Sequence, residues 1–159
     1  AALTQMKKLT LSGNKFTTLP KPIAKLTSLT ELHLGGNQLV TLPDSIAALT
    51  QMKKLTLWGN KFTKLPKPIV KLTSLTTLYL HNNKLVTLPD SMAALTALEM
   101  LWLAGNQLVT LPDSMAALMA LKELHLSLNP LAKPQSSAVE AWLTALRAGG
   151  CDLMMPDGW

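Results

Sequence analysis

The sequence predicts an α/β fold, a right-handed solenoid with six short parallel strands on its concave face and one capping helix at the C-terminal end. Three observations predict it. A segment in which leucines alternate with other residues precedes each of six asparagines. After the last asparagine the repeat is interrupted and an amphipathic segment follows. The asparagines recur at one constant spacing, at Asn14, Asn37, Asn60, Asn83, Asn106 and Asn129. A fixed period of this length is typical of solenoids, in which stacked units bury one another's apolar sides.

A short strand is expected in the first half of each repeat. In Leu32-His33-Leu34 the alternation has the two-residue period of a strand, so both leucines point inward and the histidine points outward. The recurring asparagine is predicted to be an inward polar residue, whose amide bonds backbone groups where the chain leaves the strand. We interpret the asparagine ladder as structural.

The second half of each repeat returns along the convex side. The prolines in 19–23 and 65–69 remove backbone donors, so this half is expected to be extended or to form short helical turns. An Asp-Ser pair follows Leu-Pro in three other repeats and is expected to cap such turns, at Asp44-Ser45, Asp90-Ser91 and Asp113-Ser114.

Six repeats with this period occupy residues 1–131, and residues 132–159 form a cap and a tail. Ser137-Ala-Val-Glu140 is a capping-box pattern, which predicts a helix over about 137–148 that ends at Gly149 or Gly150. Its apolar stripe covers the core of the last repeat, and the tail from Met154 is expected to pack on the cap or fray. No comparable cap precedes the first strand, so we expect its open edge to be protected by charges, by a partner or by further chain.

The repeat pattern resembles a known family. Residues 29–42, Leu-Thr-Glu-Leu-His-Leu-Gly-Gly-Asn-Gln-Leu-Val-Thr-Leu, followed by Pro43, are similar to the L-x-x-L-x-L-x-x-N-x-L core of leucine-rich repeats. The Leu-Pro that precedes an Ile or Met resembles the L-P-x-x-I-x-x-L subtype of intracellular Ras-group and many bacterial repeat proteins. The resemblance covers six successive copies in residues 1–131. It implies a solenoid that recognises a protein or peptide without catalysis.

Composition narrows the possible classes of protein. Charged residues are 15% of the chain, too few for a charge-rich disordered chain, and no apolar run approaches the roughly 18 residues of a membrane span. Cys151 is the single cysteine and cannot form an internal disulfide, and the first residues lack the apolar core of a signal peptide. A cytoplasmic protein or an exported effector is therefore expected.

The net charge of +6 is unevenly distributed. Residues 1–84 contain 12 lysines and two acidic residues, whereas residues 85–159 contain three basic and seven acidic residues, giving +10 and −4. Such polarity can steer an acidic partner to one end of a molecule. The alternative is an ordinary solvated surface, since many of the lysines recur at equivalent repeat positions.

Aromatic residues gather at outward positions that the core does not need. Trp58, Tyr79, His81 and Trp102 occupy adjacent outward positions on three neighbouring repeats and are predicted to form one patch in the middle of the concave sheet. Exposed aromatic and methionine side chains are the usual anchors of interfaces. We expect these four residues to anchor a partner and four bordering residues to adjust specificity, namely His33, Met100, Glu123 and His125. The alternatives are cross-strand stacking that stiffens the sheet, and packing against another copy or a missing domain.

The copies differ mainly on this face. Residues 1–23 and 47–69 differ at two of 23 positions, and residues 24–46 and 70–92 differ at seven. Four of those seven are outward positions: Glu31/Thr77, His33/Tyr79, Gly35/His81 and Gly36/Asn82. A constant scaffold with a varied face favours a binding surface, and the near identity of the copies also suits recent duplication or an engineered repeat scaffold.

No cofactor, metal or catalytic site is predicted. His33, His81 and His125 lie on alternate strands, so neighbouring pairs are about 10 Å apart and cannot share a zinc ion bound at about 2 Å. Cys151 is expected to be a small buried residue, and Glu123 with His125 a surface contact rather than a dyad. Glu31 separates Lys8 from Lys54, which leaves no aligned basic path for nucleic acid.

The sequence thus predicts a non-catalytic protein- or peptide-binding module, of the kind used in signalling. Three alternatives remain open at this stage. The chain is a substrate-recognition fragment of a larger effector or signalling enzyme, a structural or self-assembling unit, or an engineered repeat scaffold. Self-association through the uncapped N-terminal repeat is a further expectation about its partners.

Overall fold

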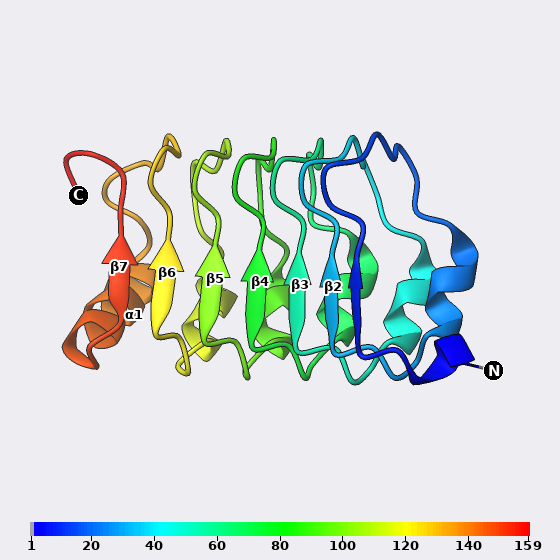
Figure 1. Ribbon diagram of the computed structural model, residues 1–159. Helices are drawn as coiled ribbons and strands as arrows, with labels where there is room; N and C mark the ends of the chain where they lie inside the picture. Colours follow the sequence, from blue (N-terminus) through cyan, green and yellow to red (C-terminus); the bar gives the residue numbers. More distant parts are fainter. Residues whose placement is uncertain (1) are drawn as a thin grey trace.

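The computed structural model describes residues 2–159, with side chains from Thr4 onward. Seven strands form one parallel sheet in sequence order (Figure 1). They are β1 (Lys8–Thr10), β2 (Glu31–His33), β3 (Lys54–Thr56), β4 (Thr77–Tyr79), β5 (Met100–Trp102), β6 (Glu123–His125) and β7 (Asp152–Met154). The predicted solenoid is confirmed, with one strand more than the sequence predicted.

The register of the sheet repeats the period of the sequence. Leu9 pairs with Leu32, and Leu32 with Leu55, so neighbouring strands from β1 to β6 align at equivalent positions of successive repeats. Side chains at equal repeat positions therefore lie in straight rows across the sheet. This register is what brings outward residues of neighbouring repeats into contact.

Short 3₁₀ helices occupy the return half of the repeats, behind the sheet in Figure 1. They are η1 (Ala2–Gln5), η2 (Lys21–Lys25), η3 (Asp44–Ala48), η4 (Lys67–Lys71), η5 (Asp90–Ala94) and η6 (Asp113–Ala117). The expected capping by Asp44, Asp90 and Asp113 is wrong, because each is the first residue inside its helix and the preceding proline takes the cap position. Asp90 instead accepts a hydrogen bond from the Ser114 hydroxyl of the next repeat, at 3.2 Å.

Leucines from both halves of the repeats fill one continuous core between the sheet and the 3₁₀ helices. The inward leucines of β2 to β6 are fully buried, whereas Leu9 and Leu11 of the first repeat are partly exposed. The asparagine ladder bonds backbone groups as predicted. Asn37 Nδ2 donates to Leu34 O and Leu11 O, both at 3.0 Å, and its Oδ1 accepts from Phe16 N at 3.2 Å.

The C-terminal helix α1 (Ser137–Ala148) covers the last repeat with Val139, Trp142, Leu143 and Leu146. The predicted capping box is displaced by one residue. Ser136, not Ser137, is the N-cap and accepts from Val139 N at 3.2 Å, while Glu140 accepts from Gln135 N at 2.9 Å.

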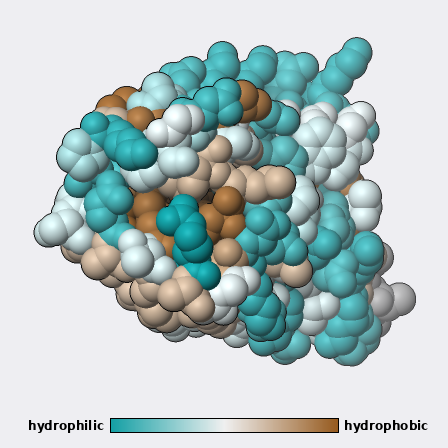
Figure 2. Space-filling model, turned by 90° about the vertical axis from the view of Figure 1, so that its left-hand side faces the viewer, coloured by the Kyte–Doolittle hydropathy of each residue, from teal (hydrophilic) through white to brown (hydrophobic). Residues whose placement is uncertain are grey.

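Part of the tail forms a strand that the sequence did not predict. Cys151 N donates to Leu146 O at the end of α1, and the chain then turns into β7. Leu153 pairs with Leu124 and continues an inward row. Figure 2 shows this end of the molecule, where hydrophobic residues lie on either side of a hydrophilic one near the centre of the face.

The turn after each strand requires a left-handed backbone. Gly13, Gly36, Gly59 and Gly105 have φ between 61° and 71° there. Asn82 and Leu128 occupy the same position with φ of 56°, a conformation that asparagine tolerates and leucine rarely adopts. No helix in the described part of the chain is long and apolar enough to cross a bilayer.

Candidate functional site

Five rings in two adjacent rows cross the outward face of the sheet from the end of β3 to β6. Tyr79 and Trp102 stack with ring centres 4.3 Å apart, and Trp102 stacks on His125 at 4.6 Å. Trp58 and His81 lie beside them with nearly parallel rings 6.0 Å apart. His81 also contacts Tyr79 and Trp102 in tilted geometry, at 6.1 and 5.5 Å. The four expected anchors therefore form one cluster, the ring cluster, and His125 belongs to it rather than to its border.

Two polar contacts fix the ring cluster at its edge. Trp102 Nε1 donates a hydrogen bond to Glu123 Oε2 at 3.2 Å, and the Tyr79 hydroxyl donates to Met100 Sδ at 3.7 Å. Glu123 and Met100 thus touch the anchors that they were expected to border. Such bonds restrain each ring to one rotamer.

Trp58 is the most exposed member of the cluster, with 39% of its surface accessible. Its indole ring lies against the backbone of Gly35 and Gly36 on the neighbouring repeat. A Cβ at Gly35 would overlap the indole Nε1. The absence of a side chain at Gly35 therefore allows the ring to lie against the backbone of the neighbouring repeat.

His33 lies apart from the stacked rings. Its Nδ1 is hydrogen-bonded to Thr56 Oγ1 at 3.2 Å and its Nε2 to Glu31 Oε2 at 3.3 Å. Glu31 also pairs with Lys8 Nζ at 3.2 Å, and the His33 and Lys8 hydrogen bonds lower the pKa of its carboxyl group. Of the eight predicted binding residues, His33 alone takes its polar partners outside the ring cluster.

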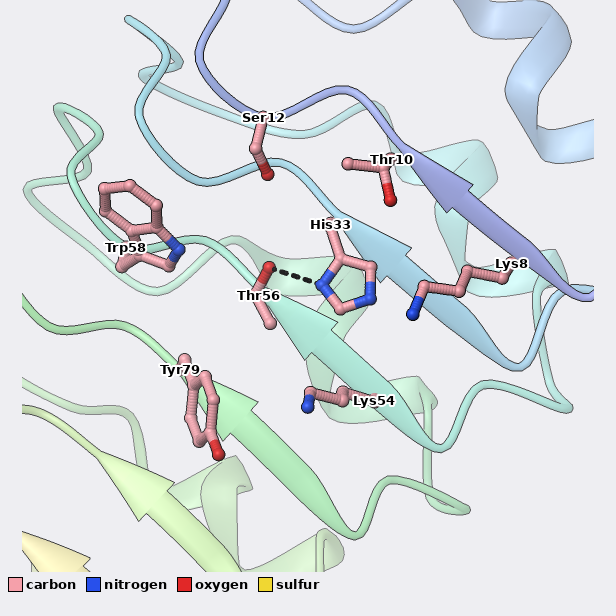
Figure 3. A pocket seen from close by; sticks show the side chains of 8 residues that line it. All are labelled: Lys8, Thr10, Ser12, His33, Lys54, Thr56, Trp58 and Tyr79. Carbon is pink, nitrogen blue, oxygen red and sulfur yellow. Dashed lines mark hydrogen bonds between the residues drawn. The ribbon is translucent and has the colours of Figure 1, made fainter.

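A hollow of about 380 Å³ opens beside the cluster, over β1 to β4. Figure 3 shows its lining residues, Lys8, Thr10, Ser12, His33, Lys54, Thr56, Trp58 and Tyr79. Lys54 Nζ lies 5.4 Å from the centre of the Tyr79 ring, a cation–π contact. The sequence analysis did not predict this hollow, although the Lys8, Glu31, Lys54 row was visible in the repeats.

Burial alters the titration of the cluster. Burial, together with the nearby His125, lowers the pKa of His81. Burial, together with the Glu123 carboxylate, raises the pKa of Tyr79. His81 Nδ1 and His125 Nε2 are buried without a hydrogen-bond partner. Desolvation disfavours the imidazolium form, so His81 stacks as a neutral ring at neutral pH.

Two other kinds of chemistry, a metal site and a reactive thiol, are not supported by the described residues. No group of three His, Cys, Asp or Glu side chains from Thr4 onward is placed to hold a metal ion. Cys151 is buried, and burial raises the pKa of its thiol, which disfavours the reactive thiolate.

Known family models match the repeats of this chain. A family model for a leucine-rich repeat region matches residues 47–148, and a model for leucine-rich repeats in two copies matches residues 4–48. The chain belongs to the leucine-rich repeat family. Leucine-rich repeat folds generally mediate binding between proteins, and their repeat domains are typically not catalytic.

Solved structures show the same repeat architecture. A leucine-rich repeat protein of Leptospira interrogans is 33% identical with a TM-score of 0.70, over 93% of this chain and 42% of that one. A TDR receptor is 29% identical with a TM-score of 0.72, over 80% of this chain and 23% of that one. This leucine-rich repeat chain thus spans less than half the length of either solved chain. The comparison with curated proteins finds no match.

Proposed function

We propose that this leucine-rich repeat chain is a non-catalytic module that binds a protein or peptide through the ring cluster. Trp58, Tyr79, His81 and Trp102 are the anchors. His33, Met100, Glu123 and His125 adjust specificity at their edges. The observation that carries the proposal is the contact of five rings across four repeats on a face whose inward side is already filled by leucine.

The position of the rings supports a binding role over a purely structural one. The sheet core beneath them is filled, because the inward side chains of Leu78, Leu80 and Leu101 are fully buried. Held aromatic rings give a partner a large apolar contact at low entropic cost. Stacking also stiffens the sheet, so the two roles are separated by measuring binding and stability on the same variants.

The proposal is tested by affinity capture from lysates of candidate source and host cells. The bait is the native chain, and the test variant carries Trp58→Ala, Tyr79→Ala and Trp102→Ala. A matched control carries Val40→Thr, Val86→Thr and Val109→Thr, which remove exposed apolar side chains outside the cluster. Quantitative mass spectrometry should find a protein retained by the native chain and the valine control but lost from the ring variant.

One result would contradict this function. Equal retention by all three baits would place the binding surface elsewhere on the molecule. Loss of retention in a ring variant whose melting temperature has also collapsed would attribute the loss to unfolding. The comparison is therefore made at a temperature where circular dichroism shows all three baits folded.

A second candidate role rests on the comparison with the solved chains. Because the chain spans 42% of one and 23% of the other, it also suits the recognition part of a longer effector or signalling enzyme. In that case the same ring cluster would select the substrate of the longer protein. Sequencing the intact transcript of the source would decide between the two roles.

A further inference from the structure

The hollow beside the ring cluster is rich in hydrogen-bond donors. Lys8 and Lys54 reach it from β1 and β3, and Thr10 and Ser12 add hydroxyl groups. In Figure 3 the indole nitrogen of Trp58 is on the side of its ring that faces the hollow. Such a set of donors suits a negatively charged group with several acceptor oxygens.

The charges in the hollow are only partly neutralised. The Glu31 carboxylate already pairs with Lys8 Nζ and is hydrogen-bonded to His33. Lys54 pairs with no carboxylate among the described side chains, although it aligns with Glu31 in the strand register. Its ammonium group lies over the Tyr79 ring instead, half-buried and directed by a cation–π contact. A cation held in this way lacks a counter-ion from the described residues.

We propose that this hollow binds the carboxylate of a Glu or Asp side chain in an extended acidic peptide segment, with Lys54 as its main counter-ion. The inference rests on the proposed function, because the same segment would place an apolar side chain against the ring cluster. Residues two apart in an extended peptide point to the same side and lie about 6.6 Å from each other. Tyr79 lines the hollow and belongs to the ring cluster, so one acidic and one apolar side chain at that spacing can engage both.

The observations favour a single carboxylate over a polyanion. Nucleic acid is bound along a path of several unpaired basic side chains. Here Glu31 lies between Lys8 and Lys54 in the register and repels a second negative charge. The hollow therefore offers one unpaired ammonium group with hydroxyl and indole donors around it, which matches one carboxylate.

The probe is the capped peptide acetyl-Gly-Ser-Glu-Ser-Phe-Ser-Gly-amide, with its Glu→Gln isostere as the reference. Both are titrated into the 15N-labelled chain and followed by NMR. The glutamate peptide should bind at least about tenfold tighter than the glutamine peptide, as expected for a hydrogen-bonded charge pair. Lys54→Gln should abolish that difference. Lys84→Gln, at an exposed lysine on the turn after β4, should preserve it.

Each alternative outcome has a distinct meaning. Equal affinity for the two peptides, with both lost in Trp102→Ala, would overturn the carboxylate site and leave the ring-cluster function intact. A tenfold preference that survives Trp102→Ala but not Lys54→Gln would support the carboxylate site and contradict the ring cluster. Tighter binding of a thymidine dodecamer or of inorganic phosphate would overturn the peptide assignment, as would no binding of the glutamate peptide at about 5 mM.

Discussion

The indole ring of Trp58 occupies the space that a side chain at Gly35 would need. The two residues occupy the same position in neighbouring repeats, so the glycine of one copy determines the conformation of the tryptophan of the next. Gly35 has no left-handed φ that would exclude alanine, and the atoms in the way belong to a partly exposed side chain. The glycine is thus a requirement of the ring cluster rather than of the backbone.

Gly35→Ala is expected to displace Trp58 while leaving the leucine core unchanged. In protein labelled with 5-fluorotryptophan, the 19F signal of Trp58 should move and those of the other three tryptophans should stay. Partner binding should fall as far as it does in Trp58→Ala. Ser127→Ala, the same position in the sixth repeat, is the control and should leave the Trp58 signal in place. An unmoved Trp58 signal in Gly35→Ala would show that the contact is absent in solution.

The stack of Tyr79 on Trp102 should contribute measurably to stability. A double-mutant cycle with Tyr79→Leu and Trp102→Leu is expected to give a coupling free energy of about 0.5–1.5 kcal/mol in thermal or urea unfolding. Trp58→Ala should change stability less than Trp102→Ala, since Trp58 makes fewer ring contacts and is more exposed. A coupling energy of zero would mean that the rings are held for binding alone.

Asparagines of the ladder should differ sharply in importance according to their place in it. Asn83 bonds Leu57 O and Leu80 O and accepts from Phe62 N, all within the buried interior. Asn83→Ala leaves Phe62 N without its acceptor and removes one of the two asparagine donors to each of the two carbonyls, which is expected to cost about 3 kcal/mol. Asn14 is exposed and bonds only carbonyls of its own repeat, so Asn14→Ala should cost less than about 1 kcal/mol. Similar losses in urea unfolding would contradict the ladder's role in joining repeats.

Leu128 combines a left-handed backbone with 77% exposure, a costly conformation for a side chain that gains little burial. Leu128→Gly should therefore stabilise the chain by about 0.5–1 kcal/mol, since relief of the strain exceeds the added entropy of the unfolded chain. Leu128→Ala removes the same side chain without relieving the backbone. If alanine stabilised the protein as much as glycine, the strain would not be the cause.

Acid should weaken the fold through His81. Its pKa is lowered in the folded state by burial and by His125, so the unfolded chain binds the proton more readily. The contribution to stability is complete above the ordinary pKa of 6.5 and is lost as pH falls through the lowered folded value. The melting temperature of the native chain should therefore fall more between about pH 7.5 and 5 than that of His81→Phe. Equal falls would assign the acid sensitivity to other groups.

The sequence predicted the solenoid because its period, its inward leucines and its asparagines all follow from stacking. It missed β7 because Leu153 is one leucine without the repeat pattern, and its pairing depends on where α1 ends. The sequence correctly placed the aromatic residues side by side, because the strand register alone determines which residues of neighbouring repeats are adjacent. The hollow was missed because it depends on rotamers, with Lys54 over Tyr79 and Trp58 against Gly35, and no residue spacing encodes these.

The strict register between successive repeats has a genetic consequence. Residues 1–23 and 47–69 differ only at Ser12/Trp58 and Thr18/Lys64, so a recombination between their coding segments would join equivalent residues. A crossover between them deletes or adds two whole repeats, and every leucine row and asparagine contact is restored at the junction. The position of the crossover decides whether Trp58 is retained. Recombination can therefore change the number of repeats by whole units without disturbing the fold. The outward residues then acquire different neighbours.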